Sequence, residues 1–128
     1  MNSVPPAMRR ALVLDPDIYS GEGLRLLCDE LGYVAEVIRS PRLVPNGIGR
    51  GGSVALALID ARIAEDGDGI GPIAARVDTL LQRAAPIIVL GGSAHWSRSL
   101  PNRRPMIVEK PIAPGRLVEI VTALQSRR

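Results

Sequence analysis

The segment Val54–Asp60, with the sequence VALALID, decides the fold class of this chain. Six consecutive apolar residues end there in a carboxylate. An uninterrupted apolar run of this length is typical of a strand that is buried on both faces of a parallel sheet. Open parallel sheets bind their ligands at the carboxyl ends of the strands. Asp60 is therefore the first candidate for a functional residue.

Two further apolar runs end in charged residues in the same way. Ala11–Leu14 is followed by Asp15, and Met106–Val108 is followed by Glu109 and then Lys110. If all three runs are strands of one doubly wound sheet, their carboxyl ends meet at one crevice. The pattern therefore predicts that Asp15, Asp60 and Lys110 lie close together.

Lys110 is also unusual in composition, because the chain has fifteen arginines and only this one lysine. Arginine carries a wide planar fork, whereas lysine carries a compact point charge on a thin stem. Since every other residue of this kind in the chain is arginine, we interpret the lysine at residue 110 as one that is needed for its compact point charge. Chance codon usage is the alternative.

The rest of the chain alternates between helical and strand-like apolar spacing. Apolar residues recur with the period of a helix over Leu24–Leu31, Ile73–Leu81 and Leu117–Leu124, while Val34–Ile38 and Ile87–Leu90 are typical of strands. Five strands that alternate with helices predict an α/β fold with a doubly wound, five-stranded parallel sheet.

Two connecting segments are poor helix material. Residues 41–52 hold two prolines and four glycines, and Ala94–Arg104 is weakly patterned. We therefore expect any second helix to be short or irregular, and the fourth to be short. Residues 9–126 are predicted to form a single domain, preceded by a flexible tail over residues 1–8.

Composition excludes several classes of protein. No apolar run approaches the roughly 18 residues of a membrane span, and the N-terminus lacks the apolar core of a secretory signal. The single cysteine, Cys28, fits a reducing cytoplasm. A net charge of +3 invites a nucleic-acid partner, but the arginines are scattered and the chain has no phenylalanine. We therefore expect a cytoplasmic protein that binds neither nucleic acid nor membranes.

The three charged strand ends indicate a chemistry. Two neighbouring carboxylates, Asp15 and Asp60, favour a hard divalent cation such as Mg²⁺. An aspartate between a cation and the ammonium of Lys110 is a suitable phosphoryl acceptor, because aspartate forms acyl-phosphate intermediates. Phosphoryl transfer needs mainly positioning and charge neutralisation.

This ordered set resembles the receiver domain of two-component response regulators over residues 9–126. Asp60 follows Asp15 by 45 residues and Lys110 follows Asp60 by 50, both close to the family's spacing, and Lys110 precedes a proline as in the family. The segment Leu26–Tyr33 resembles the end of the family's first helix. The resemblance implies a flavodoxin-like sheet of strand order 2-1-3-4-5.

The resemblance also implies roles for single residues. Asp60 is then the phospho-acceptor, Asp15 a ligand of Mg²⁺ and Lys110 the contact to the phosphoryl oxygens. Arg62 lends its backbone carbonyl to the metal. Asp17 either reaches the metal or caps the following helix.

The chain departs from the family at several of these positions. Pro16 stands where a second acid is usual, Gly91 where a switching serine or threonine is usual, and Ile107 where the switching aromatic is usual. Ala64 replaces the proline of the loop after the acceptor. Gly91-Gly92-Ser93 either cradles a phosphate through backbone N–H groups or forms a plain turn, in which Ser93 caps the next helix.

Several other residues can be explained by packing, surface exposure or loop formation without a functional role. Trp96 either contacts a partner or fills the space beside a short helix, and His95 is expected at the surface without ligand duty. Cys28 is expected to pack in the core. The acidic stretch Glu65–Asp68 resembles a calcium loop only superficially, since the twelve-residue ligand spacing is missing.

Three functions remain open at this point. The first is a single-domain receiver that is not an enzyme. It accepts a phosphoryl group on Asp60 from a histidine kinase or phosphotransfer protein and signals by binding a downstream protein. A homodimer is possible in this case. The second is a pseudo-receiver that acts as an interaction module without phosphorylation, suggested by Pro16, Gly91 and Ile107. The third is a phosphatase of the DxD type, suggested by Asp15-Pro16-Asp17.

Overall fold

The structure of the chain, a computed structural model, describes residues 9–45, 52–64, 69–91 and 95–126. The strands are β1 (Arg9–Leu14), β2 (Tyr33–Ile38), β3 (Val54–Asp60), β4 (Ile87–Leu90) and β5 (Met106–Val108). The helices are α1 (Ile18–Glu30), α2 (Ile70–Leu80), α3 (His95–Ser99) and α4 (Pro114–Gln125), with short 3₁₀ turns η2 (Pro41–Leu43) and η3 (Ala61–Ala64). Every predicted strand is present.

The five strands form one parallel sheet in the order β2-β1-β3-β4-β5. This confirms both the predicted fold class and the strand order. Near the carboxyl ends, Leu14 lies opposite Ile59 and Asp60 opposite Leu90. The register therefore brings the ends of β1, β3 and β4 to one edge of the sheet.

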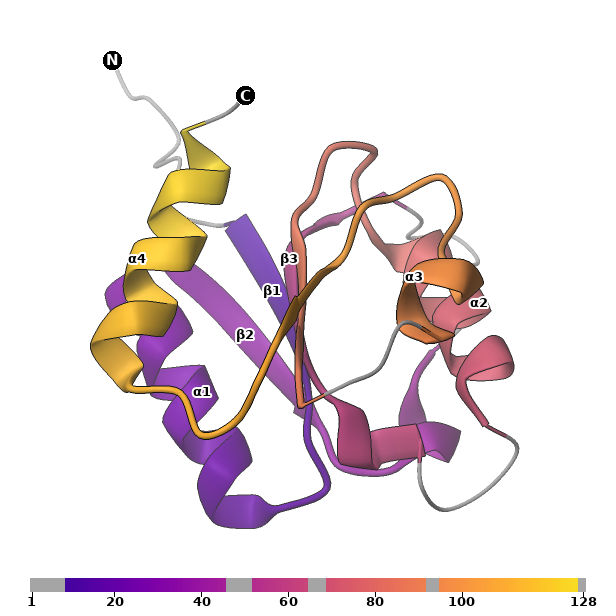
Figure 1. The fold of residues 1–128 in the computed structure, drawn as a ribbon, viewed down its shortest axis with the longest axis horizontal. Helices are drawn as coiled ribbons and strands as arrows, with labels where there is room; N and C mark the ends of the chain where they lie inside the picture. Colours follow the sequence, from indigo (N-terminus) through magenta and orange to yellow (C-terminus); the bar gives the residue numbers. More distant parts are fainter. Residues whose placement is uncertain (1–8, 46–51, 65–68, 92–94, 127–128) are drawn as a thin grey trace.

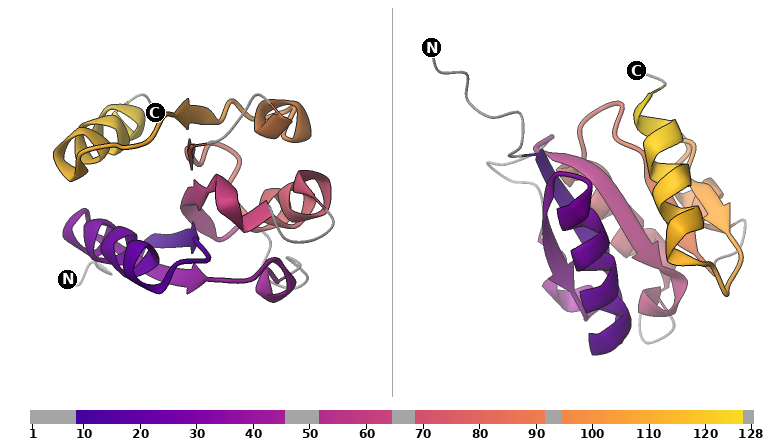
Figure 2. Two further views of the ribbon diagram at one scale, coloured as in Figure 1. Left: turned by 60° about the horizontal axis from the view of Figure 1, so that its bottom comes forward. Right: turned by 90° about the vertical axis from the view of Figure 1, so that its left-hand side faces the viewer.

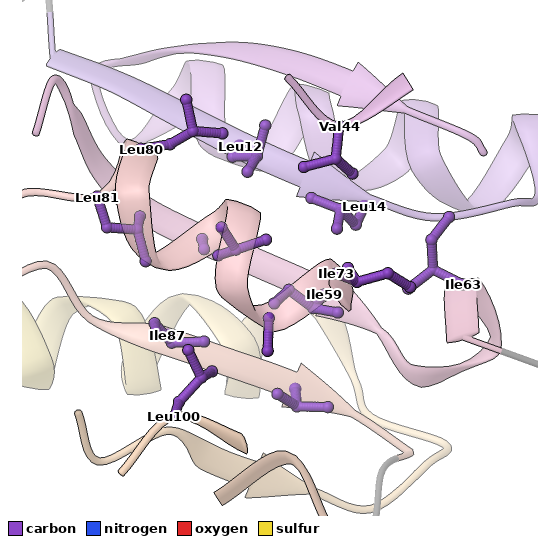
Figure 3. Packing of buried hydrophobic residues seen from close by; sticks show 14 of the residues in the cluster. Leu12, Leu14, Val44, Ile59, Ile63, Ile73, Leu80, Leu81, Ile87 and Leu100 are labelled. Carbon is purple, nitrogen blue, oxygen red and sulfur yellow. The ribbon is translucent and has the colours of Figure 1, made fainter. Parts of the chain in front are cut away.

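Helices cover both faces of this sheet. Helices α1 and α4 lie on one face, and α2 and α3 lie on the other (Figures 1 and 2). From Leu56 to Ile59, successive residues of β3 point to opposite faces: Leu56 and Leu58 pack with α1 and α4, whereas Ala57 and Ile59 pack with α2. Figure 3 shows the cluster on the α2 side. All seven residues of β3 are buried, as expected for a central parallel strand.

The described parts of the two segments that are poor helix material agree with the prediction. In the described part of residues 41–52, the 3₁₀ turn Pro41–Leu43 is the one helical element, and α3 spans five residues. Trp96 of α3 is 1 % exposed and packs in the cluster on the α2 side. The partner-contact interpretation of Trp96 is therefore wrong, because the indole fills the space beside the short helix.

Two further expectations for single side chains agree with the structure, and the others fall on residues that the structure does not describe. Cys28 is buried on α1, as predicted, and His95 is exposed. The tail over residues 1–8, the acidic stretch Glu65–Asp68 and Ser93 lie outside the described residues. Within the described part, none of the helices has the length and apolar content needed to cross a membrane.

Candidate functional site

The candidate site lies at the carboxyl edge of the sheet. Asp15 follows β1, Asp60 is the last residue of β3, and Lys110 comes two residues after β5. Asp15 and Asp60 are both 0 % exposed, and they are the two charged residues that are buried in the described part of the chain. Buried carboxylates need charged or hydrogen-bonding partners, so the neighbours of these two define the site.

Asp60 is held by two cationic side chains. Lys110 Nζ donates to Oδ2 of Asp60. From Arg62, Nε donates to Oδ1 at 3.0 Å and Nη2 donates to Oδ2 at 3.1 Å, an arrangement in which the guanidinium faces both carboxylate oxygens. The backbone N–H of Arg62 also donates to Oδ1, at 2.9 Å.

Asp15 is held by its own loop and by the same arginine. The backbone N–H of Asp17 donates to Oδ1 at 2.9 Å, and the hydroxyl of Ser20 donates to Oδ2. Arg62 Nη2 approaches Oδ1 to 3.4 Å, a contact that is long for a hydrogen bond but within ion-pair range. Arg62 therefore links the two carboxylates, which stand 45 residues apart in the chain.

This use of the Arg62 side chain is not part of the sequence-based prediction, which assigned only the backbone carbonyl to the site. That carbonyl role stays a prediction. One signal for the side chain is present in the sequence, since Arg62 stands two residues after Asp60 in a chain with many surface arginines. Nothing in the spacing indicates that the guanidinium turns back toward Asp15.

Asp17 is used as a helix cap. Its Oδ1 accepts hydrogen bonds from the backbone N–H groups of Tyr19 at 2.8 Å and Ser20 at 3.1 Å at the start of α1. These two hydrogen bonds lower the pKa of the Asp17 carboxyl below its ordinary value. The structure thus shows the capping alternative, and a metal contact from Asp17 stays a prediction.

The charges at the site keep Asp60 ionised. Burial by itself would raise the pKa of Asp60, but hydrogen bonds from the side chains of Arg62 and Lys110, together with the backbone N–H of Arg62, outweigh it. The pKa of Asp60 therefore lies below its ordinary value. In return, the hydrogen bond to Asp60 raises the pKa of Arg62.

Two of the positions that differ from the receiver pattern, Gly91 and Ile107, also lie near this edge. Gly91 has a φ of +75° and its N–H donates to the carbonyl of Val108 at 2.7 Å. Ile107 is partly buried and packs with the cluster on the α2 side. Neither position supplies a hydroxyl or an aromatic ring to the site, so the usual relay pair is absent.

As arranged, the two carboxylates do not fit a resident Mg²⁺ ion. Mg²⁺ needs oxygen ligands at about 2.0–2.1 Å, whereas the guanidinium of Arg62 already faces Oδ1 of Asp15 and both oxygens of Asp60, and Lys110 Nζ also contacts Oδ2 of Asp60. Across the described ranges, no three His, Cys, Asp or Glu side chains gather as metal ligands, and no buried side-chain nitrogen or oxygen lacks a partner. The predicted Mg²⁺ is supported only by the presence of two buried carboxylates.

Comparison with solved structures identifies the fold. A CheY-like receiver domain protein from Methanospirillum hungatei JF-1 superposes with a TM-score of 0.68 at 21 % identity, over 94 % of this chain and 96 % of the other. A response regulator receiver protein from Sinorhizobium medicae WSM419 gives a TM-score of 0.70 at 18 % identity, over 93 % and 95 %. The beryllofluoride-activated NtrC4 receiver domain dimer gives 0.68 at 18 % identity, over 94 % and 98 %.

These likenesses span nearly the whole of both chains, so this chain has the fold of response-regulator receiver domains. At the level of sequence alone, no protein-family model matches the chain and no curated protein matches it. The family resemblance read from Asp15, Asp60 and Lys110 is thereby confirmed at the level of the fold.

Proposed function

We propose that this chain, which has the receiver fold, accepts a phosphoryl group on Asp60 and passes the signal on by binding another protein. One observation carries the proposal. Asp60 is a buried, ionised carboxylate that two cations, Lys110 and Arg62, hold at the carboxyl edge of the sheet. An ionised carboxylate is a nucleophile, and two adjacent cations stabilise the charge of an incoming phosphoryl group.

The donor in this proposal is a phosphohistidine on a histidine kinase or phosphotransfer protein. An oxygen of Asp60 attacks the phosphorus atom, a P–O bond forms and the P–N bond to the imidazole breaks. The imidazole leaves with the electron pair and takes up a proton. Lys110 then contacts the phosphoryl oxygens, a task for which its point charge is suited.

A protein partner is supported by the surface at the start of α1, the helix whose Ser20 contacts Asp15. Ile18 and Tyr19, at the start of α1, are 59 % and 87 % exposed. An apolar groove of about 290 Å³ is lined by residues of α1, by Lys110 and by the start of α4. Its lining includes Leu24, Leu27, Leu90, Lys110, Pro111 and Leu117. A donor protein on this groove would bring its phosphohistidine next to the site.

The experiment that tests the proposal is incubation with acetyl phosphate, with intact mass as the readout. We expect an adduct of one phosphoryl group on the wild type, none on Asp60→Ala, and a normal adduct on Asp29→Ala, which changes an exposed aspartate of α1. One arm contains Mg²⁺ and a second contains EDTA. A folded wild type that takes up no phosphoryl group in either arm overturns the proposal.

The pseudo-receiver is the second candidate, and Gly91 and Ile107 favour it. Neither position has a hydroxyl or an aromatic ring that could couple phosphorylation of Asp60 to a conformational change at the protein surface. This candidate predicts that a downstream protein binds the wild type and Asp60→Ala with equal affinity. The first candidate predicts a difference between the two proteins.

The geometry gives no support to the phosphatase. Its general acid would be Asp17, but Oδ1 of that carboxyl accepts hydrogen bonds from the backbone N–H groups of Tyr19 and Ser20 and so caps α1, and its pKa lies below the ordinary value. We accordingly propose a signalling protein without enzymatic turnover. Steady release of phosphate that depends on Asp15 would contradict this.

Two finer proposals concern location and assembly. We place the protein in the cytoplasm, because its single cysteine, Cys28, fits a reducing compartment. A homodimer is supported by the NtrC4 receiver domain dimer among the similar structures. Light scattering before and after addition of beryllofluoride tests the dimer, since a mass of one chain in both states excludes it.

A further inference from the structure

Arg62 makes more contacts with the acidic pocket than any other side chain of the described residues. Its guanidinium faces both oxygens of Asp60 and approaches Oδ1 of Asp15. The Arg62 side chain is 42 % exposed, whereas the Asp15 and Asp60 side chains are 0 % and 1 % exposed. The arginine therefore covers the solvent side of two buried carboxylates.

Nη2 of Arg62 faces the same two oxygens that a metal ion held by both aspartates would use. This nitrogen lies 3.4 Å from Oδ1 of Asp15 and 3.1 Å from Oδ2 of Asp60. A cation bound to both oxygens at about 2.0–2.1 Å would have to lie between the same two atoms. The guanidinium, as it lies here, therefore competes with a metal ion for these two oxygens.

The charges lead to the same conclusion. Asp15 and Asp60 carry two negative charges, and Arg62 and Lys110 carry two positive charges. These four groups balance one another, and the nearby Asp17 carboxylate adds a further negative charge. Arg62 and Lys110 thus already neutralise the two buried carboxylates, which weakens the attraction of the pocket for Mg²⁺.

We propose that the guanidinium of Arg62 takes the place of the divalent cation in this pocket. Asp60 then accepts a phosphoryl group, or binds a mimic of one, without Mg²⁺, and the side chains of Arg62 and Lys110 stabilise the added negative charge. Arginine suits this task because its fork donates two parallel hydrogen bonds to carboxylate or phosphate oxygens. The part that concerns phosphoryl groups rests on the proposed function, and the part that concerns metal binding does not.

The first test is a calorimetric titration of the full chain with Mg²⁺. We compare the wild type with Arg62→Ala and with Arg62→Met, which keeps most of the aliphatic volume without the charge. Arg116→Ala removes an arginine from an exposed ion pair on α4 and is the matched control. We expect millimolar or weaker binding for the wild type and the control.

For both Arg62 variants we expect a gain of about tenfold or more in Mg²⁺ affinity, because a competing cation is removed. Submillimolar binding by the wild type that is unchanged or weaker in the folded Arg62 variants overturns the inference. Arg62→Met keeps the test decisive if Arg62→Ala does not fold.

The second test uses beryllofluoride in EDTA, followed by the chemical shifts of backbone amides. We expect the wild type to bind without Mg²⁺ and Arg62→Met to bind only when Mg²⁺ is added. A wild type that binds beryllofluoride only with Mg²⁺ contradicts the inference. If no protein binds beryllofluoride or takes up phosphate under any condition, the proposed function fails, and the Mg²⁺ titration still decides the role of Arg62.

Discussion

Gly91 lies against the side chain of Lys110. A β-carbon at residue 91 would lie 3.2 Å from Cδ and 3.4 Å from Cγ of the lysine. The φ of Gly91 is +75°, a conformation that residues with a β-carbon rarely adopt. The absence of the switching hydroxyl and the path of the lone lysine are therefore two aspects of one arrangement, in which the glycine makes room for the lysine stem.

Replacement of Gly91 should lower stability. We expect Gly91→Ser to cost about 1–3 kcal/mol in the free energy of unfolding, since a β-carbon at this φ is strained. The substitution also crowds the stem of Lys110. Urea denaturation measures the effect. Gly71→Ala in α2, where a β-carbon meets nothing within 4 Å, is the control and should be neutral or stabilising.

If Gly91→Ser is as stable as the wild type and is phosphorylated more readily, the close packing of Gly91 and Lys110 is required neither for stability nor for phosphorylation. A serine at residue 91 would then act as the missing switch hydroxyl.

Lys110→Arg should disturb the site more than its retained charge suggests. The lysine stem passes closely over Gly91 before Nζ reaches Asp60, and a planar guanidinium is wider than an ammonium group. We expect the rate of phosphorylation by acetyl phosphate to fall about tenfold, a barrier change of about 1.4 kcal/mol. Arg116→Lys on α4 should leave the rate unchanged. A wild-type rate in Lys110→Arg would mean that the lone lysine is incidental.

Asp60 should make stability depend on pH in the acidic range. Its pKa is lower in the folded chain than the value of about 3.9 expected for the unfolded chain. The stability that its ionisation contributes is therefore fully present above the unfolded pKa and is lost as the pH falls through the folded pKa. Asp60→Asn removes this contribution.

The measurement is the free energy of unfolding of the wild type and Asp60→Asn across the acidic range. We expect the advantage of the wild type to shrink as the pH falls below about 4. Asp29→Asn, at an exposed position, should follow the wild-type profile. Parallel profiles for the wild type and Asp60→Asn would mean that Arg62 and Lys110 do not stabilise the carboxylate.

Cys28 should resist thiol reagents while the chain is folded. It is 0 % exposed, and burial raises its pKa to about 12, so the reactive thiolate is scarce. We expect labelling by an alkylating reagent only as fast as the protein opens, and rapid labelling in denaturant. The double variant Cys28→Ser with Ser97→Cys carries an exposed thiol on α3 and should react at once. Equally fast labelling of the folded wild type contradicts the burial of Cys28.

The sequence by itself determined the sheet and its functional edge. The apolar runs Ala11–Leu14, Val54–Ile59 and Ile87–Leu90 are uninterrupted because these parts of the strands are buried on both faces, and that requirement is local to each strand. The residues that follow such strands lie at one edge of a parallel sheet. Asp15, Asp60 and Lys110 were therefore identifiable as neighbours from their spacing and from the resemblance to receivers.

Only the tertiary structure decided what surrounds these residues. The guanidinium of Arg62 contacts Asp15, which belongs to another strand end, and the stem of Lys110 contacts Gly91 from β4. Trp96 is buried, although a five-residue helix has too little periodicity to show which face is covered. The orientation of these side chains depends on charged groups and packing space that other helices and strands supply. The apolar periodicity of a single segment therefore does not predict it.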